Sequence, residues 1–385
     1  MIALLLISLA VAFYVFGFPM VLTVLALVSR KPYPSSCADG LPQSPANWPL
    51  VSVLVPISGR AETLPAKLTN LTAVTYPSHR LEVLLVLDGP VTGLREAFSK
   101  YRAGVECPLP LKIVQCARVG KNSALNDGVR RASGDILLFT DADALLAPDA
   151  VTHLVAAIFP EDIGGGCGRH RIRTSKGAQS IYWDLEAKIK SAEMRLLGKV
   201  TASYGTLMAV KRCWFKPIPP GVTDDHFLAL SIVAQGVRFI YTEQAVADLE
   251  KPSRNPADEI RRRRRIVCQS LYCLSLWGDL LHPGRWGWFA VCLWSHKLLR
   301  RLAPLFFIFI FFSSLVLGLQ GSLTGWLIFC AMTVGTGISA LSLGMLMVSK
   351  RLHRLLRPPA YFLAGNIGML IGLIDFMRGR RVIMW

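Results

Sequence analysis

In its central part the chain alternates short, wholly apolar runs with longer stretches in which apolar side chains recur every three or four residues. The apolar runs predict four buried strands, at 49–57, 81–89, 110–116 and 135–143. The stretches between them predict helices at 63–71, 93–101 and 121–132. Strands that are apolar on both faces and alternate with helices are typical of a parallel sheet covered on both sides. The pattern therefore predicts an α/β fold with a mainly parallel sheet.

Both ends of the chain carry longer apolar stretches. Residues 2–28 contain no charged side chain and are long enough to cross the ~30 Å hydrocarbon layer of a membrane as a helix. Arg30 and Lys31 follow directly, and the positive-inside tendency then predicts a cytoplasmic location for the next segment. Further membrane spans are predicted at 302–319 and 323–348, and a last apolar stretch at 359–377 either crosses the membrane or is re-entrant or interfacial.

Composition marks the boundaries between these parts. Residues 268–301 alternate tryptophans with basic residues, which is typical of helices lying in the membrane interface, although a soluble packing segment is an open alternative. The predicted parts are an N-terminal membrane helix at 1–29, a proline-rich linker at 30–48, a cytoplasmic α/β domain at 49–260, an arginine run with interfacial helices at 261–301, and a membrane region at 302–385.

Charge narrows the classes of partner. The chain is 52% hydrophobic and carries a net charge of +18, which suits nucleic acid, an anionic membrane surface or a phosphate-bearing substrate. The basic residues gather at the predicted membrane flanks and in the arginine run at 261–265, which favours the second and third partners. No nucleic-acid partner is expected, because no recognition motif or aromatic stacking set accompanies that run. Nine cysteines without a CxxC pair predict free thiols in a reducing compartment.

Carboxylates follow two of the predicted strands. Asp88 ends the second strand, and Asp141 and Asp143 end the fourth. The carboxyl ends of parallel strands meet at one edge of a sheet, and residues two apart in a strand point to the same face. A hard divalent cation, Mg²⁺ or Mn²⁺, takes one or two such carboxylates and leaves positions for phosphate oxygens. The acids therefore predict a metal and phosphate site, with a solvated turn as the open alternative. The chain lacks the glycine-rich motifs of standard dinucleotide and P-loop sites.

A second acidic pair, Asp224 and Asp225, precedes an apolar helical run. Thr223 or Asp224 suits the capping position of that helix, and a paired acid there also suits a general base; the two interpretations are compatible. The arginine run at 261–265 predicts contacts either to anionic lipid or to a diphosphate, which the guanidinium fork binds with two hydrogen bonds.

The order of these motifs resembles the membrane-bound family 2 glycosyltransferases, the branch that includes cellulose synthase, hyaluronan synthase and ceramide glucosyltransferase. The resemblance covers roughly residues 50–300 and is fairly specific as an ordered set. The motifs that carry it are "VSVLVPISGRAE" (51–62), the strand ending in Asp88, "GKNSALNDGV" (120–129), "FTDAD" (139–143), "TDDH" (223–226) and the arginine run.

The resemblance implies a nucleotide-sugar-binding fold of the GT-A type. It implies that Pro56, Glu62 and Asp88 hold the nucleoside, although this chain has "PISGRAE" where the family usually has an Asn-Glu pair. It implies that the two acids of "FTDAD" hold the diphosphate through Mn²⁺ or Mg²⁺, with Lys121 nearby on the sugar-nucleotide side.

The same resemblance implies the catalytic side. "TDD" matches the family's Thr-Glu-Asp, so Asp225 would be the catalytic base and Asp224 its partner. The segment "SYGTLMAVKR" (203–212) matches the acceptor-side strand, so Tyr204 and Gly205 would line that side. Side chains at 165–200 are expected to set specificity, although Trp183, Glu186 and Glu193 there are equally explained by packing or ion pairing.

The family's Gln-x-x-Arg-Trp box falls within the arginine run. Arg262 occupies its first position, Arg265 its arginine position, and Ile266 replaces the tryptophan, with a register uncertain by one residue. The resemblance implies that Arg262 contacts the substrate and Arg265 assists catalysis. The resemblance implies that in polysaccharide synthases this tryptophan contacts the growing sugar. Its absence from this chain therefore favours addition of one sugar to a lipid.

These features together predict an inverting glycosyltransferase that moves a sugar from a nucleotide sugar, expected to be a UDP-sugar, to a lipid or oligosaccharide acceptor at a membrane. We expect an integral protein of a bacterial inner membrane with its catalytic domain in the cytoplasm. The alternatives are a processive polysaccharide synthase and a non-catalytic polysaccharide-export subunit with the same fold.

Overall fold

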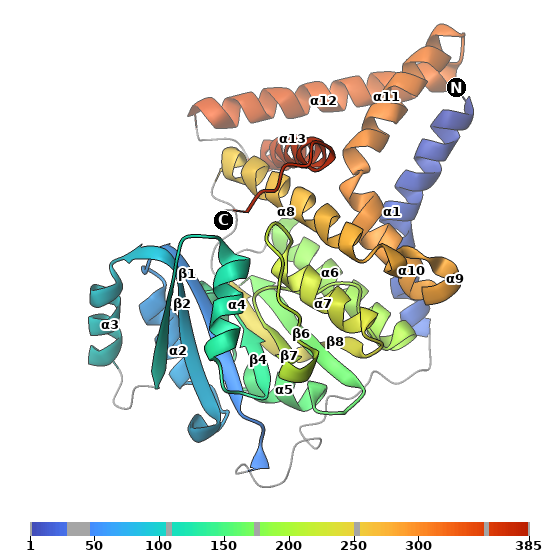
Figure 1. Cartoon of the computed structure of the whole chain (residues 1–385). Helices are drawn as coiled ribbons and strands as arrows, with labels where there is room; N and C mark the ends of the chain where they lie inside the picture. Colours follow the sequence, from blue (N-terminus) through green and yellow to red (C-terminus); the bar gives the residue numbers. More distant parts are fainter. Residues whose placement is uncertain are drawn as a thin grey trace. The chain divides into compact units, whose positions relative to one another are not determined.

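A computed structural model gives the fold of the chain (Figure 1). It describes residues 2–28, 47–104, 110–172, 178–249, 255–349 and 354–383. Most of the predicted linker at 30–48, residues 350–353, Cys37 and Cys107 lie outside the described residues. The chain forms two compact units, one made of Met1–Leu22 and Pro252–Val382 and the other of Thr23–Lys251 and Ile383–Trp385.

The described part of the second unit contains one eight-stranded sheet in the order β3-β2-β1-β4-β7-β6-β8-β5. Its strands are β1 (Val51–Arg60), β2 (Leu81–Thr92), β3 (Leu111–Cys116), β4 (Ile136–Phe139), β5 (Ala144–Leu146), β6 (Ile163–Ile172), β7 (Met208–Lys211) and β8 (Arg238–Leu249). The first four in the order are parallel, β7 runs antiparallel to both β4 and β6, β8 is parallel to β6, and β5 is antiparallel to β8. The four predicted strands and the mainly parallel α/β sheet are confirmed.

Helices connect these strands, including the three that the sequence predicts at 63–71, 93–101 and 121–132. They are α2 (Leu64–Thr72), α3 (Leu94–Ala103), α4 (Lys121–Arg131), α5 (Ala150–Ile158), α6 (Ala178–Leu197) and α7 (Asp224–Ala234), with 3₁₀ turns η3 (Ser78–Arg80) and η4 (Arg212–Trp214). Because β1 has β2 on one side and β4 on the other, the order in which successive strands are added to the sheet reverses between β1 and β4. The crevice at the carboxyl ends of the strands at such a point is where open α/β sheets bind ligands.

Helix α4 packs closely on the parallel strands, and this packing fixes where the helix begins. A Cβ atom on Gly128 would lie 2.7 Å from Val86 Cγ2 and 2.8 Å from Leu54 Cδ2, so the absence of a side chain lets the helix approach the sheet. Buried Ala124 packs in the same cluster with Val86 and Val114. The first residue of α4, Lys121, therefore lies at the carboxyl edge of the sheet.

The fourth strand is shorter than predicted. It ends at Phe139, and residues 140–143 form a turn that leads directly into β5. Asp141 and Asp143 are thus turn residues and not the end of a strand, which agrees with the preference of aspartate for turns. Since β4 is central and β5 pairs with β8 at the edge, the sheet must curl to bring that edge to the end of β4.

The other unit is helical. Its elements are most of α1 (Ile2–Val28), then α8 (Pro256–Leu276), η5 (Gly278–Leu281), α9 (Pro283–Trp286), α10 (Trp288–Leu293), the π-helix η6 (Trp294–Leu299), α11 (Ala303–Leu319), α12 (Leu323–Ser349), η7 (Arg354–Leu356) and α13 (Arg357–Met377). The helices predicted at both ends of the chain are present, and the arginine run lies on α8.

By length and composition, two helices in the described ranges can cross a membrane, Leu323–Val348 and Arg357–Met377. The predicted span at 302–319 qualifies only as part of a pair, Trp288–Leu299 and Ala303–Leu319, which is bent by 71°. The membrane crossing of α1 stays a prediction. Seven cysteines of the described ranges are free thiols, as expected.

Candidate active site

Lys121 joins the two acidic motifs. Its Nζ atom lies 2.9 Å from Asp141 Oδ1 and 2.9 Å from Asp224 Oδ2. Burial by itself lowers the pKa of Lys121, but the charges of the two carboxylates outweigh burial and raise that pKa above its ordinary value. The ammonium group therefore stays charged, and the structure brings together three predicted site residues from segments far apart in the sequence.

The carboxylates of the Asp-Ala-Asp turn repel each other. Asp143 is accessible to solvent, yet the surrounding protein desolvates its carboxyl group and Asp141 repels its charge, and both effects raise its pKa. Such a pair gains from a nearby cation.

Gly205, which is predicted to line the acceptor side, lies between the two acidic motifs. A Cβ atom on Gly205 would lie 3.7 Å from Asp141 Oδ2 and 3.9 Å from Asp225 Cβ. A larger side chain there would enter the space beside the Asp141 carboxylate and the Cβ atom of Asp225. Asp225 itself lies in the first turn of α7, where its Oδ1 accepts a 2.7 Å hydrogen bond from the backbone N–H of His226. A helix N-terminus stabilises the ionised carboxylate.

Two asparagines of α4, neither of them predicted as a site residue, hold the loop that leads into α7. Asn122 donates 2.8 Å hydrogen bonds to the carbonyl oxygens of Pro219 and Val222. Asn126 donates to the carbonyl of Ile218 and accepts from its N–H, both at 2.9 Å. The two asparagines are four residues apart and so share one face of the helix. Helix α4 therefore fixes the segment just before Asp224 and Asp225.

Asp88 shapes the turn that precedes Lys121. Its side chain is 1% exposed, and Oδ1 accepts hydrogen bonds from the N–H groups of Val119 (3.0 Å) and Gly120 (3.1 Å). Gly120 has a φ of +99°, a conformation that favours glycine. The predicted contact of Asp88 with the nucleoside stays a prediction.

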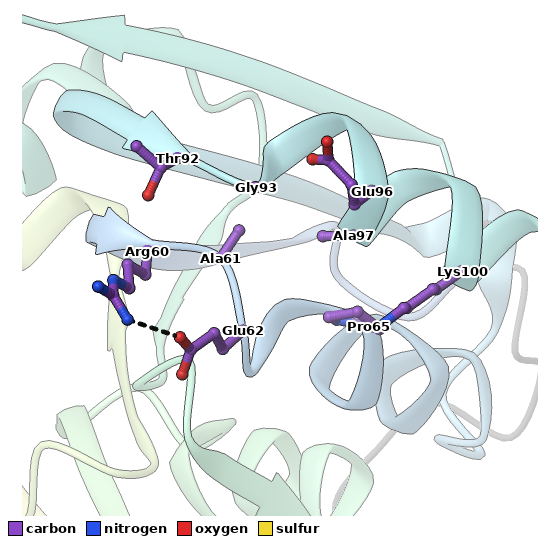
Figure 2. Close-up of a pocket in the computed structure, with 9 residues that line it drawn as sticks. All are labelled: Arg60, Ala61, Glu62, Pro65, Thr92, Gly93, Glu96, Ala97 and Lys100. Atoms are coloured by element: carbon purple, nitrogen blue, oxygen red, sulfur yellow. Dashed lines mark hydrogen bonds and ion pairs between the residues drawn. The ribbon is translucent and has the colours of Figure 1, made fainter.

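Glu62 lies at a pocket of about 390 Å³ beyond the carboxyl ends of β1 and β2 (Figure 2). Arg60 bonds Glu62 at 3.2 Å, and both side chains are largely exposed. Glu96 and Lys100 of α3 line the same pocket. Pro56 lies buried within β1, so of the two predicted nucleoside residues in "PISGRAE" only Glu62 borders this pocket.

Tyr204 belongs to a buried aromatic cluster. Its ring centroid lies 5.7 Å from that of Trp183, 5.8 Å from that of His170 and 6.3 Å from that of Tyr241. Lys190 Nζ lies 4.4 Å from the centroid of the Tyr204 ring, a cation–π geometry. The cluster fixes the backbone of Tyr204 and hence of Gly205.

The acids and aromatics expected at 165–200 have packing contacts. Trp183 packs against His170 with ring centroids 4.2 Å apart. Glu193 is 1% exposed and accepts hydrogen bonds from the N–H and the hydroxyl of Thr201 at 3.0 and 2.8 Å. These contacts favour the structural interpretation of Trp183 and Glu193.

Arg262 and Arg265 lie on α8, in the helical unit. Arg262 binds the buried carboxylate of Glu259 through Nε and Nη2, at 3.0 and 3.1 Å. The neighbouring Arg264 binds Asp375 of α13 at 2.5 Å, which gives that acid of a predicted membrane helix a partner. The roles of Arg262 and Arg265 in catalysis stay predictions.

The donor set of the turn fits a hard divalent ion. Within the described ranges, no group of three or more His, Cys, Asp or Glu side chains is arranged to hold a metal. Asp141 and Asp143 supply carboxylate oxygens only, and Mg²⁺ or Mn²⁺ is commonly held by one or two carboxylates together with substrate phosphates and water. The residues present therefore fit an ion that binds together with a diphosphate.

Residues 52–216 match the sequence family described as "Glycosyl transferase family 2". An N-acetylglucosaminyltransferase of Bradyrhizobium elkanii is 30% identical over 153 residues, which cover 37% of this chain and 79% of that protein. An N-acetylglucosaminyltransferase of Mesorhizobium japonicum is 26% identical over 239 residues, 56% of this chain and 54% of that protein. The chain spans about half the length of the curated relatives matched over the longest stretches.

A solved structure is similar along almost the whole chain. The mannosyltransferase PcManGT from Pyrobaculum calidifontis, in complex with GDP-Man and Mn²⁺, has a TM-score of 0.70 and 24% identity, covering 97% of this chain and 99% of that one. This likeness confirms the GT-A type fold that the motif order implied.

Proposed function

Because this chain belongs to the family 2 glycosyltransferases, we propose that it transfers one sugar from a nucleotide sugar, a UDP-sugar in our proposal, to a lipid acceptor at a membrane. The observation that carries the proposal is the bridge that Lys121 makes between Asp141 and Asp224, 2.9 Å from each. The bridge joins the motif proposed to hold the diphosphate to the motif proposed to hold the base. Donor and acceptor thus meet at one edge of the sheet.

In this proposal the nucleotide sugar lies across the carboxyl ends of β1 and β4. Glu62, Asp88 and Pro56 are the residues proposed for the nucleoside, and Asp141 with Asp143 for Mg²⁺ or Mn²⁺. Such an ion, when bound, offsets the negative charge that develops on the diphosphate leaving group. Lys121 supplies a second positive charge that is already in position, so little reorganisation is needed during the reaction.

Asp225 is the proposed base. It would take the proton of the acceptor hydroxyl as that oxygen attacks the anomeric carbon, while the bond to the diphosphate breaks. A single displacement from the face opposite the leaving group inverts the configuration at that carbon. Asp224 is held by Lys121, and the Cβ atom of Asp225 lies near Gly205, which is proposed to line the acceptor side.

The acceptor and the location follow from the apolar helices. Two helices that can cross a membrane, together with the exposed Trp288 of α10, support a lipid acceptor and a membrane location. Ile266, where polysaccharide synthases have tryptophan, supports addition of a single sugar. We propose that residues 49–260 form the catalytic domain on the cytoplasmic side of a bacterial inner membrane. Arg262 is proposed to bind the substrate and Arg265 to assist catalysis.

Substitution of the base tests the proposal. Asp225→Asn should abolish sugar transfer and leave binding of a nucleoside diphosphate unchanged, measured with the full chain in detergent and membrane lipid extract as acceptor. Asp162→Asn is a matched control, because Asp162 is an exposed acid that pairs with Arg238 away from the site. Transfer by Asp225→Asn at the rate of the unmodified chain would contradict the assignment.

A further inference from the structure

Lys67 of α2 is a fully buried lysine that the proposed mechanism does not use. Its side chain is 0% exposed, and it shares a helix face with buried Leu64, Leu68 and Leu71. Lysine is almost never fully buried unless its charge is paired, because removing an ammonium group from water is costly. Lys67 therefore needs interaction partners that offset the free-energy cost of its burial.

The partners of Lys67 lie at both ends of the Asp-Ala-Asp turn. Lys67 Nζ donates to Thr140 Oγ1 at 2.7 Å and to the carbonyl oxygen of Ala144 at 2.5 Å. These two residues directly flank Asp141 and Asp143. The Thr140 hydroxyl in turn donates to the carbonyl of Thr206 at 2.8 Å, so the same chain of hydrogen bonds reaches the residue after Gly205.

The two carboxylates also act on Lys67 through their charge. Burial lowers the pKa of Lys67 to about 7, and the negative charges of Asp141 and Asp143 oppose that decrease. The lysine is thus coupled electrostatically to both acids while it bonds the two residues that flank them.

A neutral residue of the same helix makes a comparable contact. Asn70, one turn after Lys67, donates to the carbonyl of Leu146 and accepts from its N–H, both at 2.7 Å. Both residues join α2 to the segment that contains the Asp-Ala-Asp turn and β5, but only Lys67 brings a charge. This pair allows the mechanical and the electrostatic contributions to be separated.

We propose that Lys67 is a positioning residue and an internal counter-cation of the Asp-Ala-Asp turn. It holds the turn in shape without a metal, and it competes with a free divalent ion for the negative charge of the two carboxylates. The inference rests on the proposed function only in taking Asp141 and Asp143 as the metal-binding pair. It follows that a free ion binds weakly. The ion binds well only when a nucleotide supplies further phosphate oxygens.

Manganese binding without nucleotide tests this inference. The full chain in detergent is titrated with Mn²⁺ at pH 6.5, and free Mn²⁺ is measured by electron paramagnetic resonance. Lys67→Met keeps much of the side-chain volume and removes the charge, so affinity for Mn²⁺ should rise by roughly threefold or more. Asn70→Leu removes the neutral contact and should not raise that affinity.

Each result of the titration is decisive. If Lys67 had only a mechanical role, Lys67→Met should bind Mn²⁺ more weakly than the unmodified chain. Either weaker binding or an unchanged affinity overturns the inference. If the unmodified chain binds no Mn²⁺ even with a nucleoside diphosphate present, the metal part of the proposed function fails instead.

A double-mutant cycle covers the case in which Lys67→Met is too unstable to titrate. Asp143→Asn is introduced into both the unmodified chain and Lys67→Met, and thermal unfolding of the four proteins is compared without metal. If Lys67 acts as a counter-cation, Asp143→Asn should change thermal stability more favourably in the Lys67→Met background than in the unmodified chain. Alternatively, of the two proteins that carry Lys67→Met, only the double variant should fold. Equal effects in both backgrounds, or failure of both Lys67→Met proteins to fold, overturn the inference.

Discussion

The side-chain amide of Asn122 donates a 2.8 Å hydrogen bond to the carbonyl oxygen of Val222, two residues before Asp224. Asn122 follows Lys121, so consecutive residues of α4 hold the backbone before the acidic pair and the carboxylate of its first member. The start of α4 therefore sets the geometry of both acidic motifs.

We predict that Asn122→Ala lowers the rate of sugar transfer by about 10- to 100-fold, because small displacements of a base are costly. Affinity for the nucleoside diphosphate should change little, so kcat falls while the donor KM stays near its original value. Gln235→Ala is the matched control, since Gln235 makes the same kind of amide-to-backbone contact at the other end of α7. Equal losses in the two variants would contradict a specific role for Asn122.

Lys121→Met should weaken binding of the nucleoside diphosphate by about 10-fold or more. The substitution removes a positive charge beside the proposed diphosphate position and leaves Asp141 and Asp224 without their shared partner. Isothermal calorimetry in the presence of Mn²⁺ measures the change. Lys211→Met, whose ammonium group binds the carbonyl oxygens of Phe159 and Pro160, is the control and should bind nucleotide normally.

Gly205→Val should reduce transfer by about 10-fold or more with little loss of thermal stability, and Gly205→Ala should have a smaller effect. A Cβ atom at this position meets Asp141 and Asp225 only at 3.7 and 3.9 Å, ordinary contact distances, so the fold tolerates it. The added atoms of valine, however, enter the proposed acceptor space. Gly104→Val is the comparison, because a Cβ there meets only backbone atoms at 3.6 and 3.8 Å. Full activity of Gly205→Val would show that the acceptor binds elsewhere.

The lowered pKa of Glu82 predicts that the stability of the fold depends on pH. Burial alone would raise its pKa, but hydrogen bonds from Lys112, Ser133 and Ser52 outweigh burial and lower the pKa to about 2. A carboxyl group with a depressed pKa stabilises the fold above its unfolded pKa, and this stabilisation is lost as pH falls from about 4.5 towards 2.

The measurement compares Glu82→Gln with the unmodified chain. At pH 7 the variant should be less stable by about 1–2 kcal/mol, allowing for partial solvent screening, and the difference should shrink at pH 3. Glu62→Gln is the control, because Glu62 and its partner Arg60 are largely exposed. A difference that is independent of pH would mean that the charge of Glu82 contributes nothing.

Some of the expected elements depend on local pattern alone. The apolar runs of β1 and β2 are buried over nearly their whole length, so burial fixes strand and position together. The periodic stretches form α2, α3 and α4 within a few residues of the predicted bounds. The Asp-Ala-Asp and Asp-Asp motifs were likewise visible as acids beside apolar runs.

Other elements cannot be predicted from the local sequence pattern. Strand β6 contains Gly164, Gly165, Gly166 and Gly168, residues that are usually depleted in strands. A Cβ atom on Gly168 would lie 2.2 Å from the carbonyl oxygen of Ala245, so glycine is required by the close approach of β8 and not by the strand itself. Lys67 is visible in the sequence only as a charged residue on the apolar face of α2, together with Leu64, Leu68 and Leu71. Its role depends on which residues lie beneath that face.

The sequence by itself determined the α/β class, the long apolar helices and the family to which the chain belongs, because burial, periodicity and motif order are properties of neighbouring residues. Only the tertiary structure decided that the fourth strand ends at Phe139, that Lys121 joins Asp141 to Asp224, and that Lys67 lies under the turn. Those contacts depend on the order and curl of the strands, which bring residues distant in sequence to one edge of the sheet. No local pattern encodes that order.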